Sequence, residues 1–399
     1  MEKWIEEHRH DDVNELALRA AHCPDVDMRE AIVQIRGWQI AEKKLPLWAE
    51  TQGIRFPDHL PLEQCSSQLT AEYKASLVGV NENENQNLHS MTDLTGGFGV
   101  DAVMMGRRFQ HLTYVEQRED LCELARHNFP LLGLKDFEVI HGDCVETLKH
   151  LPHQNLLLID PARRDANGRK TVAISDCTPD VCALNRLLLE KADVVMIKLS
   201  PMLDIASAER QLEGVTQIHV VSVSGECKEV LLILSPITAY GLSSGGPLIT
   251  CADITREGVQ LFRFTREDEQ QASCQYTSYV GTYLYEPNAS LMKACPFRFL
   301  AQHYQLMKLH PNSHLYTSNE WIADFPGRRF KVEEVLPINK QTVKQISQLR
   351  QANVSVRNFP ATVAELRKRF RLSDGGTTYL FATTLADKRK VLVVAKYAT

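Results

Sequence analysis

The sequence predicts an α/β protein, in which a mostly parallel sheet carries helices on both faces, with a helical segment before it and a small α+β module after it. Between residues 88 and 235, short apolar runs alternate with helical patterns, as in parallel sheets joined by crossover helices. Before this region apolar residues recur at helical spacing, and after residue 323 strand and helix patterns alternate over a shorter stretch. A chain of 399 residues with 44% hydrophobic composition is expected to form two or three domains.

Residues 1–75 are predicted to be a helical N-terminal region. Residues 13–21 and 28–45 carry apolar side chains three and four positions apart, and a proline follows each pattern, where a helix is expected to end. Residues 63–79 are predicted to form another helix, which leads into a glycine-rich stretch.

Residues 76–240 are predicted to contain the sheet. The strand candidates are the apolar runs at 88–94, 111–116, 136–143, 155–161, 193–201, 216–225 and 229–235. Helical patterns separate all of them except the last two. Because parallel strands need a crossover connection, we expect the last two runs to form an antiparallel pair at the edge of the sheet.

Two further parts are predicted after residue 240. Residues 241–322 combine a Gly/Ser-rich connection, a β-hairpin at 248–264 and an extended piece followed by a helix, as the turn residues indicate. Residues 323–399 show strand, helix, strand, helix and a terminal hairpin, which predicts a compact α+β domain.

Composition argues against several classes of protein. The first residues are acidic and polar, where a secretory signal needs a basic start and an apolar run, and no stretch approaches 18 apolar residues, so we expect a cytoplasmic protein that does not span a membrane. The ten cysteines include no C-x-x-C pair. They predict neither a disulfide scaffold nor a metal site.

Charge is unevenly distributed along the chain. Residues 326–399 contain 15 Lys and Arg against 5 Asp and Glu, a net charge of +10, whereas the whole chain has a net charge of −5. A basic terminal module on an acidic body is typical of a nucleic-acid interface. The alternative is a solvated basic surface without a partner.

The stretch SMTDLTGGFGVDA, residues 90–102, contains the most specific motif. From Gly97 it satisfies G-x-G-x-x-G/A, and Glu116 lies 19 residues after Gly97, at the end of the next strand candidate. This spacing fits a dinucleotide site. Asp93 argues against one, because a carboxylate about 4 Å from a pyrophosphate would cost roughly 4 kcal/mol at an effective dielectric of 20. The same carboxylate attracts an ammonium group, and S-adenosylmethionine has both an ammonium group and a ribose diol for Glu116.

Three later motifs fit that cofactor. Asp143, in HGDC, follows the third strand candidate and can accept a hydrogen bond from an adenine amino group. Asp160 and Pro161, in LLIDPARR, follow the fourth, and VMIKLSP ends the fifth. These ends lie at the carboxyl edge of a parallel sheet, where open α/β folds bind ligands.

With these motifs, residues 88 to about 235 resemble a class I S-adenosylmethionine-dependent methyltransferase, which has a Rossmann-like sheet. In that family the glycine loop holds the methionine part of the cofactor, the acid after strand two binds ribose, the acid after strand three reads adenine, and the strand-four motif meets the substrate. The cofactor contacts that the resemblance implies are Asp93, Thr95, Gly96, Gly97, Phe98, Gly99, Asp101, Glu116, Asp143 and Cys144. The catalytic residues that it implies are Asp160, Pro161, Ala162 and Arg163.

The strand-four motif departs from two familiar versions. Relatives that methylate base amines commonly carry Asp/Asn-Pro-Pro-Tyr/Phe, but here Ala162 and Arg163 replace the second proline and the aromatic residue. Some uridine carbon-5 enzymes carry Asp-Pro-Pro-Arg and a catalytic cysteine after strand five, where this chain has Leu199, Ser200 and Pro201. Without that thiolate, covalent attack on the base is not expected. We therefore predict direct transfer to a nitrogen nucleophile.

The C-terminal part resembles uncharacterised bacterial methyltransferases with a ferredoxin-like insert and a THUMP-like domain, on the segments EPNASLMKA, LHPNSHLYTS, FPGRRF, RNFP, ELRKRF and DGGTTYLFATTL. THUMP domains bind structured RNA, so the resemblance implies an RNA partner. The candidate phosphate contacts are Arg328, Arg329, Lys331, Arg367, Lys368, Arg369 and Arg371. Phe330, Phe359 and Phe370 are expected in the core and not on a stacking surface.

The sequence thus predicts an S-adenosylmethionine-dependent methyltransferase that modifies a nucleotide in structured RNA, either tRNA or rRNA. A non-catalytic RNA-binding or cofactor-sensing module that retains affinity for S-adenosylmethionine remains as the alternative, because the strand-four motif is altered. A nicotinamide oxidoreductase is disfavoured by Asp93.

Overall fold

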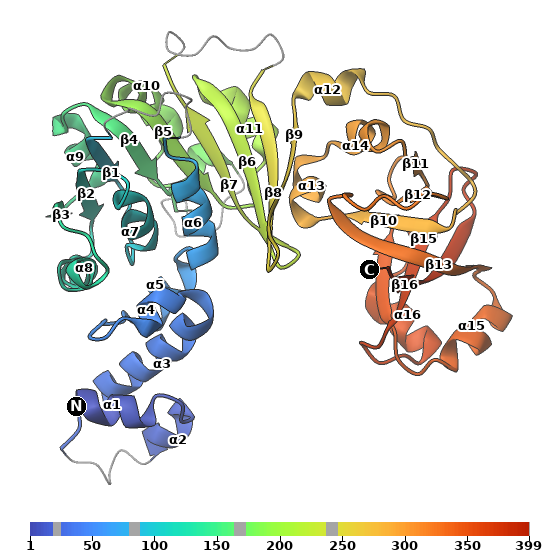
Figure 1. Cartoon of the computed structure of the whole chain (residues 1–399), viewed down its shortest axis with the longest axis horizontal. Helices are drawn as coiled ribbons and strands as arrows, with labels where there is room; N and C mark the ends of the chain where they lie inside the picture. The colour runs from blue at the N-terminus through green and yellow to red at the C-terminus, as the bar shows by residue number, and fades with distance from the viewer. Residues whose placement is uncertain (19–24, 80–87, 163–172, 237–245, 399) are drawn as a thin grey trace. The chain divides into compact units, whose positions relative to one another are not determined.

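The computed structural model describes residues 1–18, 25–79, 88–162, 173–236 and 246–398 (Figure 1). The chain divides into two compact units. The first comprises residues 1–218 and 228–241, and the second comprises residues 219–227 and 242–399.

Among the described residues, the first sheet has nine strands in the order β3-β2-β1-β4-β5-β7-β6-β8-β9. Strands β1 to β5 are parallel, and β7 is antiparallel to β5. Their bounds are β1 Ser90–Asp93, β2 His111–Glu116, β3 Phe137–His141, β4 Gln154–Ile159, β5 Ala192–Leu199, β6 Val215–Val223, β7 Glu226–Leu234, β8 Leu248–Thr255 and β9 Gly258–Phe264. The strand order reverses between β1 and β4, which is the switch point where such sheets bind ligands. The predicted α/β sheet is confirmed.

We expect the last two strand candidates at the edge of the sheet, but the structure places them inside it. They form β6 and β7, which are adjacent in the sheet, but β8 and β9 continue the sheet beyond β6. The β8–β9 hairpin itself is antiparallel, as predicted. The prediction of an edge was wrong because the backbone groups of an edge strand can pair with any further strand. The sequence of β6 and β7 does not show that the β8–β9 hairpin pairs with them.

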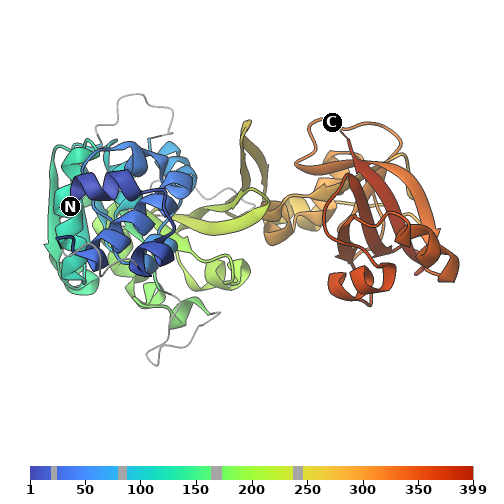
Figure 2. The same ribbon diagram turned by 90° about the horizontal axis from the view of Figure 1, so that it is seen from below.

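Helices α7 to α11 connect the strands of the first unit: α7 Val100–Gly106, α8 Glu119–Leu131, α9 Cys144–His150, α10 Val181–Lys191 and α11 Ile205–Gln211, with a 3₁₀ turn at Ile174–Asp176. Because parallel crossovers are right-handed, the reversal of strand order at β1 places α7 and α8 on one face and α9 and α10 on the other (Figures 1 and 2). The core lies between these layers, where Met91, Leu157 and Ile197 are fully buried.

The N-terminal helices are α1 Glu2–His8, α2 Val13–Leu18, α3 Met28–Lys44, α4 Pro46–Glu50, α5 His59–Gln64 and α6 Gln68–Ser76. Asp27 caps α3 by accepting from the Glu30 N–H. The single helix expected over 63–79 is instead divided between α5 and α6. The break has a local cause, because the Ser67 side chain accepts from the Thr70 N–H and begins a new helix. Helix α6 then packs against α7.

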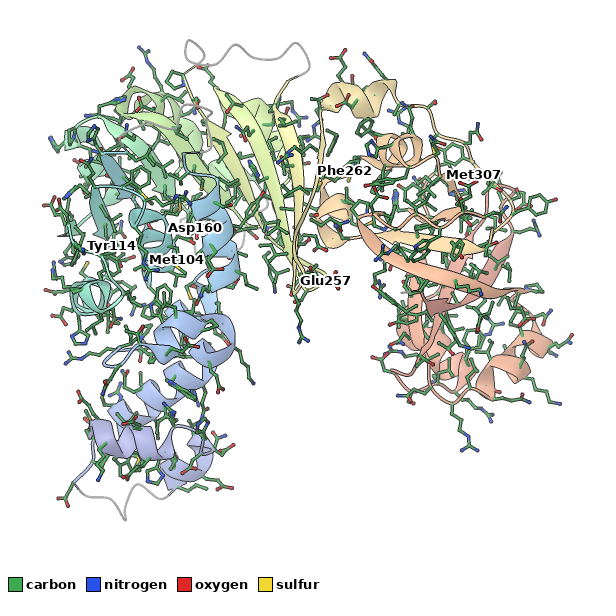
Figure 3. All side chains as sticks on the ribbon, viewed as in Figure 1. Met104, Tyr114, Asp160, Glu257, Phe262 and Met307 are labelled. Atoms are coloured by element: carbon green, nitrogen blue, oxygen red, sulfur yellow. The ribbon has the colours of Figure 1, made fainter. Side chains whose placement is uncertain are left out.

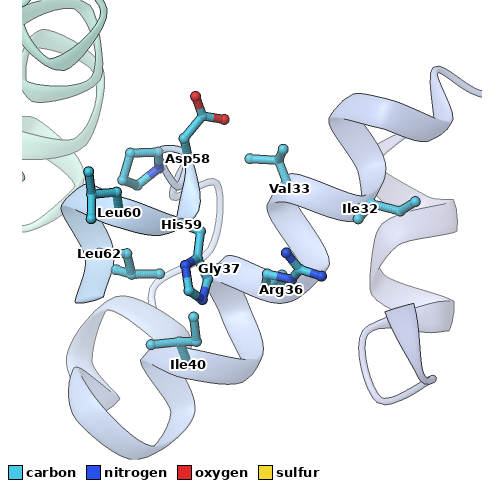
Figure 4. Close-up of a pocket in the computed structure, with 10 residues that line it drawn as sticks. Ile32, Val33, Arg36, Gly37, Ile40, Asp58, His59, Leu60 and Leu62 are labelled. Atoms are coloured by element: carbon cyan, nitrogen blue, oxygen red, sulfur yellow. The ribbon is translucent and has the colours of Figure 1, made fainter. Parts of the chain in front are cut away.

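A cavity of about 340 Å³ lies among these helices (Figure 4). Its lining is Ile32, Val33, Arg36, Gly37, Ile40, Pro57, Asp58, His59, Leu60 and Leu62. No sequence-predicted site residue lines it. Among the described residues, no helix is both long enough and apolar enough to cross a membrane.

The second unit contains a mixed sheet, which has seven strands among the described residues, in the order β11-β12-β10-β13-β16-β15-β14. Its strands are β10 Tyr283–Pro287, β11 Met307–Lys308, β12 Tyr316–Ser318, β13 Gly327–Pro337, β14 Asn353–Arg357, β15 Thr378–Thr384 and β16 Lys390–Tyr397. The helices are α12 Arg266–Gln271, α13 Ala289–Ala294, α14 Phe297–His303, α15 Lys340–Ser347 and α16 Val363–Phe370. The predicted strand and helix order after residue 323 is confirmed.

Each face of this second sheet has its own apolar cluster. Leu366 and Phe370 of α16 and Ile346 of α15 pack on one face, whereas Leu309 and Phe330 belong to the cluster on the other. Phe330 and Phe370 are fully buried, and Phe359 packs against the first cluster. The expectation that these three rings belong to the core is confirmed.

Candidate active site

The glycine loop lies between β1 and α7, and its glycines serve different purposes. A Cβ atom at Gly96 would lie 2.0 Å from the Tyr114 ring, and one at Gly99 would lie 2.6 Å from the Phe129 ring. Both positions therefore need glycine for packing. Gly97 has φ +56°, and a Cβ there would meet nothing within 4 Å. The loop therefore presents an open side at Gly97, where a ligand can approach the backbone.

Two side chains from β2 fix this loop in place. The Tyr114 hydroxyl donates to the Gly97 carbonyl at 2.5 Å, and the Gly97 N–H donates to Glu116 Oε2 at 2.8 Å. Phe98 is buried, with its ring centroid 6.3 Å from that of Phe56. The ring of Phe98 thus anchors the loop to the segment between α4 and α5.

Asp93 ends β1 directly behind the loop. Its side chain is buried and its Oδ1 accepts from the Thr95 N–H at 3.1 Å. Burial raises the pKa of Asp93 to about 8, against the lowering effect of the Thr95 N–H. A cation placed beside this carboxyl group would favour its charged form.

Glu116 and Asp143 follow β2 and β3. Glu116 Oε1 accepts from the Arg118 N–H at 2.9 Å, so each of its oxygens already has one backbone donor. Asp143 caps α9 through Oδ1, and its Oδ2 accepts from Gln117 Nε2 at 2.9 Å. A carboxylate has about four acceptor positions, so neither group is saturated. Cys144 is buried, and burial raises the pKa of its thiol to about 11.

Asp160, at the end of β4, is joined to the glycine loop and to β5. Its backbone N–H donates to Thr95 Oγ1 at 2.7 Å, and its Oδ2 accepts from Lys198 Nζ at 2.5 Å. The Asp160 side chain is 40% exposed, whereas that of Lys198 is 14% exposed. Asp160 (labelled in Figure 3) is therefore held at the rim by a lysine that lies deeper.

Lys198 belongs to a chain of buried charges. Asp101 Oδ2 lies 3.7 Å from Lys198 Nζ, and Asp101 Oδ1 lies 3.2 Å from Lys74 Nζ, which lies 2.6 Å from Glu229 Oε1. Ser66 donates to Asp101 Oδ2 at 2.7 Å. Burial by itself would lower the pKa of Lys198, but the carboxylates of Asp160 and Asp101 outweigh it and hold this pKa above its usual value. Lys198 is therefore an ammonium ion at neutral pH.

The rest of the strand-four motif is arranged differently. Pro161 is buried and Ala162 is exposed. Both backbone groups of Ala162 bond to Thr178, at 2.8 and 3.0 Å, so the Ala162 carbonyl already has a partner. Arg163 lies outside the described residues.

The structure brings most of the predicted site residues of the first unit together. Thr95 joins the glycine loop to Asp160, Gly97 joins it to Glu116, and Asp143 meets Gln117, the residue after Glu116. Asp101 turns toward the lysines and lies on the Asp160 side of the site. Sequence reasoning missed Lys74, Lys198 and Glu229. Lys198 lies within the apolar run VVMIKL and Glu229 begins the run EVLLIL, whereas Lys74, in AEYKAS, gives no such signal.

The predicted phosphate contacts of the second unit fall into two sets. On β13, Arg328 bonds to Glu286, Arg329 lies over the Trp321 ring at 5.2 Å, and Lys331 is exposed. At the end of α16 Arg367 pairs with Asp374, while the side chains of Lys368, Arg369 and Arg371 are exposed.

The second unit matches two family models, a ferredoxin-like domain over residues 283–326 and a THUMP-like domain over residues 327–396. The whole chain matches the crystal structure of a "putative methyltransferase" from Porphyromonas gingivalis W83, with 34% identity, coverage of 100% of this chain and 97% of that one, and a TM-score of 0.88. None of the curated proteins matches.

Two further structures match part of the chain. An S-adenosylmethionine-dependent methyltransferase from Agrobacterium tumefaciens has 15% identity, coverage of 46% of this chain and 66% of that one, and a TM-score of 0.35. An rRNA methylase from Streptococcus thermophilus has 11% identity, coverage of 42% and 93%, and a TM-score of 0.31. These scores are too low to support an inference about function.

Proposed function

This chain belongs to the family of class I S-adenosylmethionine-dependent methyltransferases with ferredoxin-like and THUMP-like domains, and from this membership we propose that it methylates a nucleotide in structured RNA, either tRNA or rRNA, in the cytoplasm. In this proposal residues 76–240 perform the chemistry and residues 323–399 bind the RNA. Residues 1–75 support the catalytic part, and residues 241–322 connect it to the RNA-binding part.

The glycine loop fits S-adenosylmethionine better than a dinucleotide. Gly97 leaves the outer side of the loop open, and the carboxyl group of Asp93, at the end of β1 before the loop, is buried. Such a group would oppose a pyrophosphate but attract the ammonium of the methionine part. Glu116, which keeps acceptor positions free, would take the ribose hydroxyls. When bound, the cofactor supplies a methyl group on a positively charged sulfur.

The observation that carries the proposal is the bond between Lys198 and Asp160 at the carboxyl edge of β4. Lys198 Nζ bonds Oδ2, and in this proposal Oδ1 accepts a hydrogen bond from the N–H of the nucleophile. Such a direct transfer needs no side chain that attacks the base covalently. Positioning of the nucleophile in line with the methyl–sulfur bond would supply most of the rate.

The RNA part of the proposal rests on the second unit. Residues 327–396 match the THUMP-like family model, and residues 326–399 have a net charge of +10. A surface of this sign attracts the phosphate backbone without regard to sequence. Three side chains at the C-terminal end of α16 are exposed and can contact phosphates: Lys368, Arg369 and the capping residue Arg371.

Two measurements test the proposal. Calorimetric titration should show binding of S-adenosylmethionine and no binding of NAD. Mass spectrometry of nucleosides from tRNA and rRNA should then show one methylated nucleoside that is lost when the gene is deleted and restored when it is returned. Binding of the cofactor and of RNA without any lost nucleoside would favour the non-catalytic alternative.

A further inference from the structure

A buried carboxylate in the second unit holds two arginines from different strands. Glu286 of β10 is 2% exposed. Its Oε2 accepts from Arg328 Nε at 2.8 Å and also from Arg328 Nη2, and its Oε1 lies 2.8 Å from Arg357 Nη2. Ser355 donates to the same Oε1 at 3.4 Å. One acid thus orients two guanidinium groups.

Both guanidinium groups also remain accessible from outside. The side chain of Arg328 is 48% exposed and that of Arg357 is 33% exposed. Arg328 lies over the rings of Phe330 and Tyr379, at 5.6 and 5.9 Å from their centroids. The aromatic rings and the carboxylate together restrict the rotation of Arg328, so its plane is fixed before any ligand arrives.

The charge around this acid does not balance. Two arginines on one carboxylate leave one positive charge. Lys308 is 2% exposed and close enough, with Arg357, to lower the pKa of His314, which burial mainly brings to about 4. Burial lowers the pKa of Lys308, and Glu269, the carboxylate that opposes this effect, is paired with Arg298.

Two buried polar atoms at this place have no hydrogen-bond partner within the described part of the chain. They are Nε of Arg357 and Nδ1 of His314. Unpaired buried polar atoms are rare in folded proteins, but Nε of Arg329 and Nε of Arg367 are also unpaired among the described residues. The case for an anion therefore rests on the two accessible guanidinium groups that share one carboxylate. An ion pair that served stability alone would need one arginine and would gain little over apolar packing.

We propose that Arg328 and Arg357, oriented by Glu286, form a binding site for a phosphodiester group of RNA. The inference rests on the proposed function and adds a defined anion site to it, including Arg357, which the charge count alone did not single out. A guanidinium group matches phosphate because its planar donors bond two oxygens at once. Arg328 bonds Glu286 through Nε and Nη2, which leaves Nη1 as a donor. Arg357 bonds Glu286 through Nη2 and the Val356 carbonyl through Nη1, and the second N–H group on each of these nitrogens supplies its donors.

The test uses the full-length protein and unfractionated bacterial tRNA in filter-binding titrations at several salt concentrations. Arg357→Gln and Arg328→Gln should each weaken binding about tenfold, and each should make the log-log salt slope shallower by about 0.7 to 0.9 for one lost phosphate contact. Arg350→Gln is the matched control, because it removes the same charge from an exposed residue of the same unit. It should change affinity less than about twofold.

The outcomes separate the two proposals. If the unaltered protein binds neither unfractionated tRNA nor rRNA in the same titration, the RNA function fails and this inference fails with it. If the unaltered protein binds, but Arg357→Gln and Arg350→Gln behave alike, only the anion site is overturned. Circular dichroism and S-adenosylmethionine binding report whether each variant is folded. If Arg357→Gln does not fold, Arg357→Lys is used in its place. This variant keeps the charge, so the salt slope should stay the same while the affinity for tRNA falls several-fold. An unchanged affinity would contradict recognition by the planar guanidinium group.

Discussion

Lys198 Nζ lies 2.5 Å from Asp160 Oδ2, and this contact joins the ends of β5 and β4 at the carboxyl edge of the first sheet. The lysine is the deeper partner, and the carboxylate reaches the surface. In this arrangement Lys198 is a positioning residue. It acts on the substrate through the orientation of Asp160.

The first prediction concerns Lys198. Lys198→Met should keep S-adenosylmethionine affinity within about threefold but lower kcat for methyl transfer at least tenfold, since a lost positioning contact affects mainly the transition state. The surface variant Lys149→Met serves as control. A loss of kcat matched by an equal loss of S-adenosylmethionine affinity would leave Lys198 a merely structural role.

The second prediction concerns stability. Lys74 is fully buried between Asp101 and Glu229, so Lys74→Met should lower the free energy of unfolding by about 3 to 5 kcal/mol, as expected when one partner of a buried ion pair is removed. Urea unfolding provides the measurement. Lys3→Met, at a side chain that is 89% exposed, should cost less than about 0.5 kcal/mol. Adding Glu229→Gln to Lys74→Met should recover part of the loss, and a further loss would argue against the pairing.

Much of the fold was predictable, because its signals are local. Strand periodicity and the glycine motif identified β1 to β5 and the loop at Gly97, each from a few consecutive residues. The charge network was not predictable, because Lys74 and Glu229 are 155 positions apart. In the run VVMIKLSP, Lys198 resembles an ordinary charged residue at the end of a strand.

The same limit applies to the basic module. The sequence shows how many arginines are present, but not which of them are paired. Arg328 was predicted to contact phosphate without its partner Glu286, which lies 42 positions earlier. Pairing between distant residues depends on the order of the strands, and composition does not contain that order.

The third prediction concerns Asp93 and pH. Asp93→Ala should weaken S-adenosylmethionine binding at least tenfold, about 1.4 kcal/mol. In the unaltered protein the pKa of Asp93 is about 8, so the carboxyl group is mostly protonated at pH 6 and charged above pH 8. Affinity for the ammonium-bearing cofactor should therefore rise between these values, until the cofactor's own amino group loses its proton. Calorimetry across this range checks it. A flat profile that Asp93→Asn does not alter would remove Asp93 from the cofactor site.

The fourth prediction concerns the C-terminal end of α16. Neutralising Arg367, Lys368 and Arg369 together should flatten the salt dependence of RNA binding by about two log-log units if all three contact phosphates. Arg367 is paired with Asp374. If only the two exposed side chains contact phosphates, the log-log slope should flatten by about 1.4. Filter binding with total cellular RNA measures the slope. An unaltered slope would assign this cluster to solubility.

The most direct test of the central claim is transfer of a labelled methyl group from S-adenosylmethionine to total tRNA and rRNA, by the unaltered protein and by Asp160→Ala, with cofactor binding measured in parallel. Label should enter one RNA fraction with the unaltered protein. Asp160→Ala should bind the cofactor with unchanged affinity and lose most of the transfer, because the contact at Asp160 matters chiefly in the transition state. Full transfer by Asp160→Ala, or cofactor binding by the unaltered protein with no transfer to either RNA, would contradict the account.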